Sequence, residues 1–226
     1  MLVNSTPQPP IEFETGADPH ASIILFHGLG TSGHSFKSLT QNLTLTDVGS
    51  VRFVLPNAPT QAVTWANGQY LPAWYDLRYN DFTVSEDETG LRAAMNYYQL
   101  LIDREIERGI SPERIIIGGF SQGGAISLMT GIRFGKRLGG IFSMSGYLPI
   151  ASTTLAEQHN VNRETSIFIG HGQYDTIVLP SLAEEAYYLL QEQGHHVTWN
   201  IYPIKHTISQ AELDDLNSWL VNLLKK

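Results

Sequence analysis

The sequence predicts an α/β fold in which helices cover both faces of a mostly parallel, doubly wound sheet. Short apolar runs rich in β-branched residues alternate along the chain with segments whose apolar residues recur at helical spacing. Apolar runs of this kind are typical of parallel strands that are buried on both faces. The chain has 226 residues and is 42% apolar, which suffices for a single domain spanning residues 1–226.

Six short runs are expected to form the strands of this sheet. They lie at residues 22–26, 51–55, 114–118, 140–144, 166–170 and 197–202. The first reads SIILF and the fifth reads SIFIG, without the polar alternation of a strand that faces water on one side. We therefore expect these strands to form a parallel sheet that is covered on both faces.

Four helices are expected between and after the strands, at residues 86–108, 122–133, 182–193 and beyond Ser209. The first is amphipathic, with apolar residues at helical spacing, namely Leu91, Met95, Tyr98, Leu101, Ile102 and Ile106. Ser209 and Glu212 form a capping box that predicts the start of the last helix. The alternation of strands and helices favours a doubly wound sheet.

Two segments fall outside the alternation. Residues 1–20 include a proline-rich stretch and are expected to form an extended lead-in. Residues 56–85 show no clear period, yet they carry the large apolar side chains Trp65, Leu71 and Trp74. Long loops in compact domains are usually lids or binding loops, so we expect a lid over a ligand site, with these three residues contacting the ligand.

The overall composition excludes several classes of function. The chain has no cysteine, and its formal net charge is −8. Disulfides and thiol nucleophiles are therefore excluded, and an acidic surface is a poor match for nucleic acid. The first ten residues lack the basic and apolar regions of a signal peptide, and no apolar run reaches the roughly 18 residues of a membrane span. We expect a cytoplasmic protein without a transmembrane segment.

A nucleophile motif follows the third predicted strand. Gly119-Phe-Ser121-Gln-Gly123 matches G-x-S-x-G and lies between the strand at 114–118 and the helix at 122–133. This strand–turn–helix context defines the nucleophile elbow of the α/β-hydrolase fold, in which glycines let strand and helix approach closely. The sequence thus predicts an α/β-hydrolase fold with Ser121 as the nucleophile.

The order Ser, acid, His in this fold selects the other two members of a triad. After Ser121 the only aspartates are Asp175, which follows a strand, and a pair inside the last helix. His206 follows the last strand, whereas His195 and His196 precede it and are interpreted as a solvated turn. Ligands bind at the carboxyl ends of parallel strands, which favours Asp175 and His206.

The remaining histidines support no metal site. His27 and His171 each follow a strand and could lie beside the catalytic groups. Neither an H-x-x-x-H nor an H-E-x-x-H pattern occurs, so we expect neither a metal nor a cofactor.

The loop after the first predicted strand has two interpretations. In an esterase, His27–Gly30 would supply an oxyanion donor at the N–H of Leu29, beside a second donor at the N–H of Gln122. Alternatively, Gly28 to Gly33 spells the dinucleotide fingerprint G-x-G-x-x-G. That alternative also needs an acidic residue at the end of the next strand, where Pro56-Asn57 stands instead.

Five motifs together resemble a known family. They are HGLG at 27–30, AWYD at 73–76, GFSQGG at 119–124, HGxxD at 171–175 and a histidine shortly after a strand that ends in Tyr-Pro. From Ile23 to the C-terminus the chain is similar to the phospholipase/carboxylesterase family of α/β-hydrolases, which includes acyl-protein thioesterases and bacterial carboxylesterases. Two departures are Lys205 and Thr207, which flank the histidine where relatives often have a small residue or methionine and a serine.

The resemblance implies a compact hydrolase without a large cap domain. It implies hydrolysis of carboxylic esters, lysophospholipids or palmitoyl thioesters, with Ser121, Asp175 and His206 as the triad. Leu29 and Gln122 match the oxyanion donors of the family.

The first functional hypothesis is an esterase or thioesterase that works through an acyl-serine intermediate. Its expected partner is a small acyl ester or thioester, including lysophospholipids or acylated proteins, and Ile177 and Val178 beside the acid are expected to contact it. The chain would be a monomer or homodimer. The alternatives are a catalytically silent binding protein on a hydrolase scaffold and the dinucleotide-binding protein.

Overall fold

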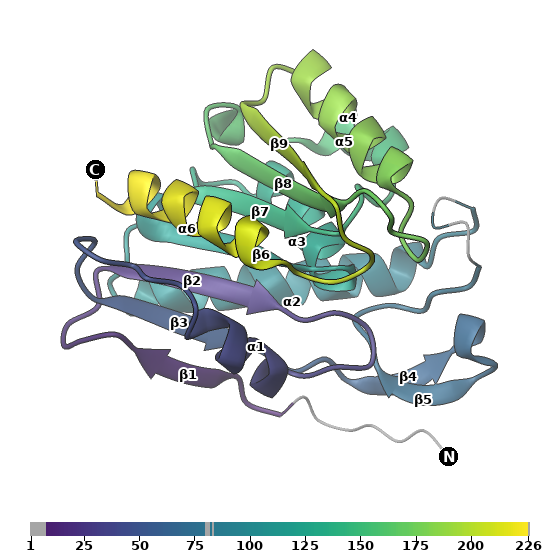
Figure 1. The fold of residues 1–226 in the computed structure, drawn as a ribbon, viewed down its shortest axis with the longest axis horizontal. Coiled ribbons are helices and arrows are strands. Elements are labelled where there is room, and N and C mark those ends of the chain that lie inside the picture. The colour runs from purple at the N-terminus through teal and green to yellow at the C-terminus, as the bar shows by residue number, and fades with distance from the viewer. Residues whose placement is uncertain (1–7, 80–81, 83, 226) are drawn as a thin grey trace.

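A seven-stranded sheet runs through the centre of the molecule, and helices lie on both of its faces (Figure 1). The computed structural model describes residues 8–79, 82 and 84–225. The strands are β1 (Ile11–Glu14), β2 (Ala21–Phe26), β3 (Val51–Leu55), β6 (Ile115–Phe120), β7 (Gly140–Met144), β8 (Ile167–Gly172) and β9 (Val197–Tyr202). The predicted fold class is confirmed, and all six predicted strands are present within two residues of their expected ends.

The strand order is β1-β3-β2-β6-β7-β8-β9, and every neighbouring pair from β3 to β9 is parallel. The carboxyl ends of these strands therefore share one edge of the sheet. Figure 1 shows that the described residues place no large cap domain over this edge.

Strand β1 was not expected within the segment interpreted as an extended lead-in. Residues 1–7 of that segment lie outside the described residues. Ile11–Glu14 pairs antiparallel with β3, and its apolar residues alternate with glutamates. Phe13 stacks on Phe53 with ring centroids 5.0 Å apart. The alternation is typical of an edge strand that faces water on one side.

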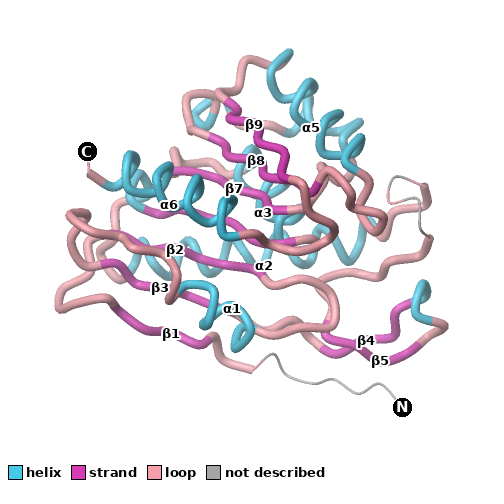
Figure 2. The backbone as a smooth tube through the Cα atoms, viewed as in Figure 1, coloured by secondary structure: helices cyan, strands magenta, loops and turns pink. Residues whose placement is uncertain are grey.

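The helices divide into two layers, which are visible in Figure 2. The longer helices are α1 (Gly33–Thr40), α2 (Glu88–Glu107), α3 (Gln122–Arg133), α5 (Pro180–Glu192) and α6 (Gln210–Leu224). Helices α2, α3 and α5 bury apolar residues in one core cluster, whereas α1 and α6 contribute to the cluster on the opposite face. Because each face buries its own core, β2, β3, β7 and β8 are buried throughout, whereas the edge strands β1 and β9 are only partly buried.

The ends of the helices follow local signals. Helix α6 begins after Ser209, whose hydroxyl accepts the Glu212 N–H at 3.1 Å, which is the serine half of the predicted capping box. The glutamate half does not form, because the Glu212 carboxyl is buried without a hydrogen-bond partner among the described residues. Helix α1 was not predicted, because its eight residues are too few for a clear apolar period. The shorter helical pieces are α4 (Thr154–Glu157), η2 (Pro112–Arg114), η3 (Ala151–Thr153) and η4 (Asn160–Asn162).

The segment at 56–85 contains regular structure. A hairpin separate from the main sheet is formed by β4 (Thr60–Val63) and β5 (Gln69–Pro72), and they are joined by η1 (Thr64–Ala66) and a turn at Asn67-Gly68 (Figure 1). Asn67 and Gly68 both have positive φ, as this tight turn requires. Residues 80, 81 and 83 of the segment lie outside the described residues.

Within the described part of the chain, no helix combines the length and apolar character needed to cross a membrane.

Candidate active site

Ser121 stands at the sharp turn between β6 and α3. Its backbone has φ 56° and ψ −120°, a conformation that is strained for any residue with a side chain. A Cβ atom at either Gly119 or Gly123 would overlap the carbonyl oxygen of Phe26 on the neighbouring strand. The two glycines therefore let β2, β6 and α3 approach closely enough to present the serine at the carboxyl edge.

His206 joins Ser121 to Asp175 in one hydrogen-bonded chain. The Ser121 hydroxyl lies 3.0 Å from His206 Nε2, and His206 Nδ1 donates to Asp175 Oδ2 at 2.6 Å. The three residues come from the ends of β6, β8 and β9, although 85 residues separate the first from the last. In this tautomer Nε2 is free to accept the serine proton.

Asp175 is held as an anion by its surroundings. Its Oδ1 accepts the N–H groups of Ile177 at 2.8 Å and Val178 at 3.0 Å. Burial by itself would raise the pKa of Asp175, but hydrogen bonds from His171 and His206 outweigh burial and hold the pKa well below its usual range. His171 Nε2 also lies 2.9 Å from the carbonyl oxygen of Val178. This charged, fixed carboxylate can stabilise a protonated His206.

The two expected oxyanion donors belong to the start of α3 and to the loop after β2, where Gly28 packs close to Ser121. The N–H of Gln122 is the first of α3, and the first four N–H groups of a helix have no intrahelical acceptor. Leu29 lies in the loop after β2, where Gly30 N donates to Pro72 O at 2.8 Å and the Ala58 N–H donates to His27 Nε2 at 3.0 Å. No hydrogen bond among the described residues uses the Leu29 N–H, which would leave it available to a developing oxyanion.

Among the other histidines, His195 is the one that the structure places differently from our interpretation. It is buried rather than solvated, and its Nε2 lies 2.9 Å from Gln158 Oε1. His196 is exposed, and its carbonyl oxygen accepts the N–H of Ile167 at the amino end of β8. Both residues therefore lie at the edge of the sheet opposite Ser121. The solvated-turn interpretation was wrong for His195, because the turn packs against the segment before η4.

The dinucleotide interpretation gains no support from the geometry. A pyrophosphate would need the free N–H groups at the start of the helix that follows the glycines. Here the first N–H of α1, that of Gly33, donates to the side-chain oxygen of Asn57 at 2.9 Å. A Cβ atom at Gly33 would meet the carbonyl group of Leu55, so this glycine serves packing against β3.

The five expected substrate contacts differ in their surroundings. Trp65 and Ile177 are exposed, at 43% and 45% of their surface. Leu71 is partly buried on β5, Val178 is buried in the core, and Trp74 is 4% exposed and stacks on Phe26 at 4.1 Å. The structure therefore presents the side chains of Trp65, Leu71 and Ile177 to a ligand more openly than those of Val178 and Trp74.

Two features of the site lay beyond the sequence analysis. The side chain of Gln122 bonds the backbone of Trp74 and Tyr75, and the hydroxyl of Tyr75 meets that of Tyr147. The AWYD motif was the available signal, but a motif does not say which atoms it contacts. Lys205, the departure beside the histidine, is exposed to solvent.

The fold and the hydrogen-bonded Ser–His–Asp chain at the carboxyl edge define a serine hydrolase of the α/β-hydrolase class. The model of the Phospholipase/Carboxylesterase family matches residues 11–224, and the chain belongs to this family. The resemblance stated from the motifs is thereby confirmed.

Individual relatives agree in length as well as sequence. The chain is 34% identical over 220 residues to acyl-protein thioesterase 1 of Gibberella zeae, covering 93% of this chain and 94% of the relative. It is 35% identical to acyl-protein thioesterase 1 of Neurospora crassa, covering 97% and 93%. The crystal structure of Arabidopsis thaliana SOBER1 superposes with a TM-score of 0.85 at 31% identity, covering 91% of this chain and 99% of that one.

Proposed function

We propose that this protein hydrolyses acyl esters and thioesters through an acyl-serine intermediate on Ser121. The observation that carries the proposal is the continuous chain from Ser121 Oγ through His206 to Asp175, with distances of 3.0 and 2.6 Å. A serine hydroxyl is a weak nucleophile unless a base takes its proton and a third group orients that base. The three side chains meet both requirements.

The reaction proceeds in two halves. His206 Nε2 takes the Ser121 proton as Oγ attacks the carbonyl carbon, and the N–H groups of Leu29 and Gln122 hold the resulting oxyanion. The protonated imidazole, stabilised by Asp175, then gives its proton to the leaving alcohol or thiol. Water repeats the sequence on the acyl-serine and releases the carboxylic acid.

The proposed substrate class rests on the names of the family and of the relatives. Relatives named acyl-protein thioesterases favour a fatty acyl thioester on a protein, and the family name also favours lysophospholipids and simple carboxylic esters. The β4–β5 hairpin, with Trp65 and Leu71, is the surface proposed to cover the acyl chain.

We further propose a cytoplasmic location, since the chain has no cysteine for disulfides, and a monomer or homodimer as the working form.

A fluorophosphonate probe with peptide mass spectrometry tests the nucleophile. We expect one modified residue, Ser121, no labelling in Ser121→Ala, and unchanged labelling in Ser218→Ala, which replaces an exposed serine on α6. An unlabelled wild-type protein would instead support a silent binding protein on this scaffold. Matched oxyester and thioester series of increasing acyl length, assayed on the labelled preparation, then define the substrate class.

A further inference from the structure

The segment Pro72–Asp76, which we call the strut, bonds both loops that carry the oxyanion donors. On the Leu29 side, the carbonyl oxygen of Pro72 accepts the Gly30 N–H at 2.8 Å. On the same side, Trp74 Nε1 donates to the carbonyl oxygen of His27 at 2.8 Å. Two hydrogen bonds therefore fix the backbone on both sides of Leu29 to the strut.

The side chain of Gln122 makes the corresponding connection from the elbow. It is 3% exposed, its Oε1 accepts the Trp74 N–H at 3.1 Å, and its Nε2 donates to the carbonyl oxygen of Tyr75 at 3.0 Å. A buried primary amide can accept and donate in this way at once, whereas a carboxylate cannot donate and a thioether does neither strongly. The residue whose own N–H faces the oxyanion is thus clamped through its side chain to the strut.

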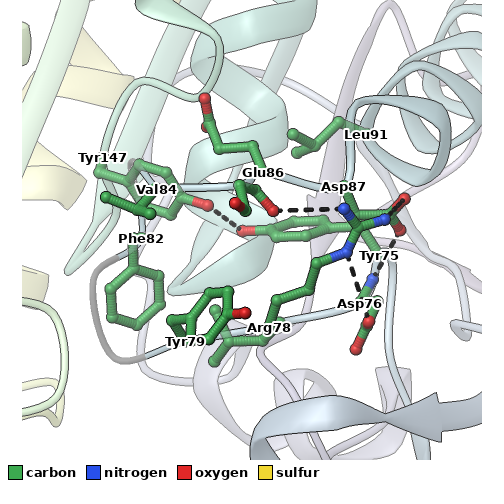
Figure 3. Close-up of a pocket in the computed structure, with 12 residues that line it drawn as sticks. Tyr75, Asp76, Arg78, Tyr79, Phe82, Val84, Glu86, Asp87, Leu91 and Tyr147 are labelled. Carbon is green, nitrogen blue, oxygen red and sulfur yellow. Dashed lines mark hydrogen bonds and ion pairs between the residues drawn. The ribbon is translucent and has the colours of Figure 1, made fainter.

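The strut is also held on the side away from Gln122. The Tyr75 hydroxyl lies 3.0 Å from that of Tyr147, and the Asp76 N–H donates to Asp87 Oδ2 at 2.9 Å (Figure 3). Burial raises the pKa of Tyr75, so this pair of hydroxyls stays neutral. The hollow lined by these side chains measures about 10 Å³, roughly the space of one water molecule.

We propose that the side chain of Gln122 is a positioning residue that fixes the separation of the two oxyanion donors through the strut. The inference rests on the proposed function. Oxyanion donors act only when they lie about 2.7–3.1 Å from the oxygen as it becomes charged, and a shift of about 1 Å can cost about 100-fold in rate. Without the hydrogen bonds of the Gln122 side chain, the N–H groups of Gln122 and Leu29 are no longer held at a fixed separation. Stabilisation of the transition state is then lost, whereas substrate binding is unchanged.

Three variants test this role. Gln122→Met keeps the length of the side chain and removes both bonds. Trp74→Phe keeps an aromatic ring against Phe26 and removes the bond to His27, so it loosens the strut from its opposite end and gives a result even where the first variant folds poorly. Thr130→Val is the matched control, because Thr130 is buried in the same helix and its hydroxyl has no partner among the described residues.

Each variant is assayed for kcat and KM on a short ester, with active sites counted by fluorophosphonate labelling. The inhibition constant Ki is measured for a trifluoromethyl ketone, which adds reversibly to serine and places an oxyanion in the hole. For Gln122→Met and Trp74→Phe we expect kcat to fall about 10- to 100-fold with KM within about twofold. The ketone Ki should rise by the same factor as kcat/KM falls. The double variant should lose less than the product of the two single losses, because both act through the strut.

Thr130→Val should stay within about twofold of wild type in every constant. Unchanged kcat in Gln122→Met and Trp74→Phe, or a rise in KM without a rise in ketone Ki, would overturn the positioning role. So would an equal loss in Thr130→Val, which would mark a general effect of the helix core. Ser121→Ala, carried through the same assays, tests the proposed function separately: its inactivity beside an unaffected Gln122→Met would leave that function intact.

Discussion

The carboxyl edge of the sheet and the β4–β5 hairpin are held in different ways. At the edge, Ser121 and Asp175 are 9% and 3% exposed, and each is bonded to its neighbour in the chain of three. In the hairpin, Trp65 and Tyr70 are 43% and 64% exposed, and the two short strands form a separate two-stranded sheet in the described part of the chain. The groups proposed for catalysis are therefore buried and hydrogen-bonded, whereas the side chains proposed to select the acyl chain are exposed and held by fewer contacts.

The strut, at the base of the hairpin, lies between these two regions. The hairpin continues directly into residues that bond the loop after β2 and the side chain of Gln122. We expect substitutions in the strut and at the carboxyl edge of the sheet to change kcat. We expect substitutions at the hairpin tip to change KM by an amount that depends on the length of the acyl chain. The predictions below run from the largest effect to the smallest.

Ser121→Ala gives the largest expected effect. Removing one oxygen atom should reduce ester hydrolysis by about 10⁴-fold or more, because no acyl-enzyme can form. The melting temperature should change little, since the strained backbone at Ser121 is set by its surroundings. Initial rates and thermal melts on the same preparation check both statements. Substantial activity in a preparation shown free of contaminating esterase would remove Ser121 from the mechanism.

His206→Ala should approach the same loss, while His195→Ala and His196→Ala should keep activity within about twofold. His195 lies at the opposite edge of the sheet, but it is buried and bonded to Gln158. Its loss should therefore lower the free energy of unfolding by about 1–2 kcal/mol without touching kcat. Urea denaturation and steady-state kinetics on all three variants separate the two roles. Inactivity of the His195 variant at full stability would contradict the assignment.

Asp175→Asn should lower kcat by about 10³- to 10⁴-fold with the fold intact. The amide cannot stabilise protonated His206, and its NH₂ group can select the wrong imidazole tautomer. Because the pKa of Asp175 is held well below its usual range, the carboxylate contributes stability at neutral pH that is lost as the pH falls through its native pKa. Asp175→Asn should lack this part of the loss of stability at low pH, which thermal melts at a series of pH values can measure.

At the hairpin tip, Trp65→Ala and Leu71→Ala should raise KM for medium-chain acyl esters by about 3- to 10-fold and for acetyl esters by less than about twofold. The reason is that each lost contact removes binding in proportion to the chain that it covered. Tyr188→Ala, which removes an exposed aromatic residue on α5, is the control and should change neither. Equal increases on short and long chains would show that the hairpin does not cover the acyl chain.

The smallest effect on activity is expected from Glu212→Gln, behind the catalytic edge. Glu212 is fully buried in α6 beside Gly170, and burial raises its pKa to about 7. A raised carboxyl pKa means that the native state keeps the proton longer than the unfolded chain, so Glu212 lowers stability as the pH rises from about 4.5 through 7. The gain from Gln should be larger at pH 8 than at pH 5, with an upper limit of about 3 kcal/mol.

Denaturation curves at the two pH values measure that gain, and Asp214→Asn, an exposed carboxyl on the same helix, is the control that should show no such difference. A gain in Glu212→Gln that is independent of pH would mean that the carboxyl does not titrate in the native state. Activity at pH 8 should stay within about twofold in both variants.

The site and the strands were predictable because their signals are local. The elbow needs G-x-S-x-G between a strand and a helix, and the order of strand ends selects Asp175 and His206. The structure brings these three side chains together. Helix α1 was not predictable, since eight residues are too few to show a clear apolar period, whereas the alternation in β1 was present but was interpreted as part of an extended lead-in. The hairpin was missed because its two strands have four residues each and only Val63 of β4 is fully buried.

The sequence by itself determined the fold class, the family and the residues proposed for catalysis, because buried strands, tight turns and helix caps each demand particular residues over a few positions. The tertiary structure alone decided that Gln122 clamps Trp74 and Tyr75, that His195 is buried on Gln158, and that Asp175 accepts the N–H groups of Ile177 and Val178. These contacts depend on distances between elements, which packing fixes and which no short stretch of sequence encodes.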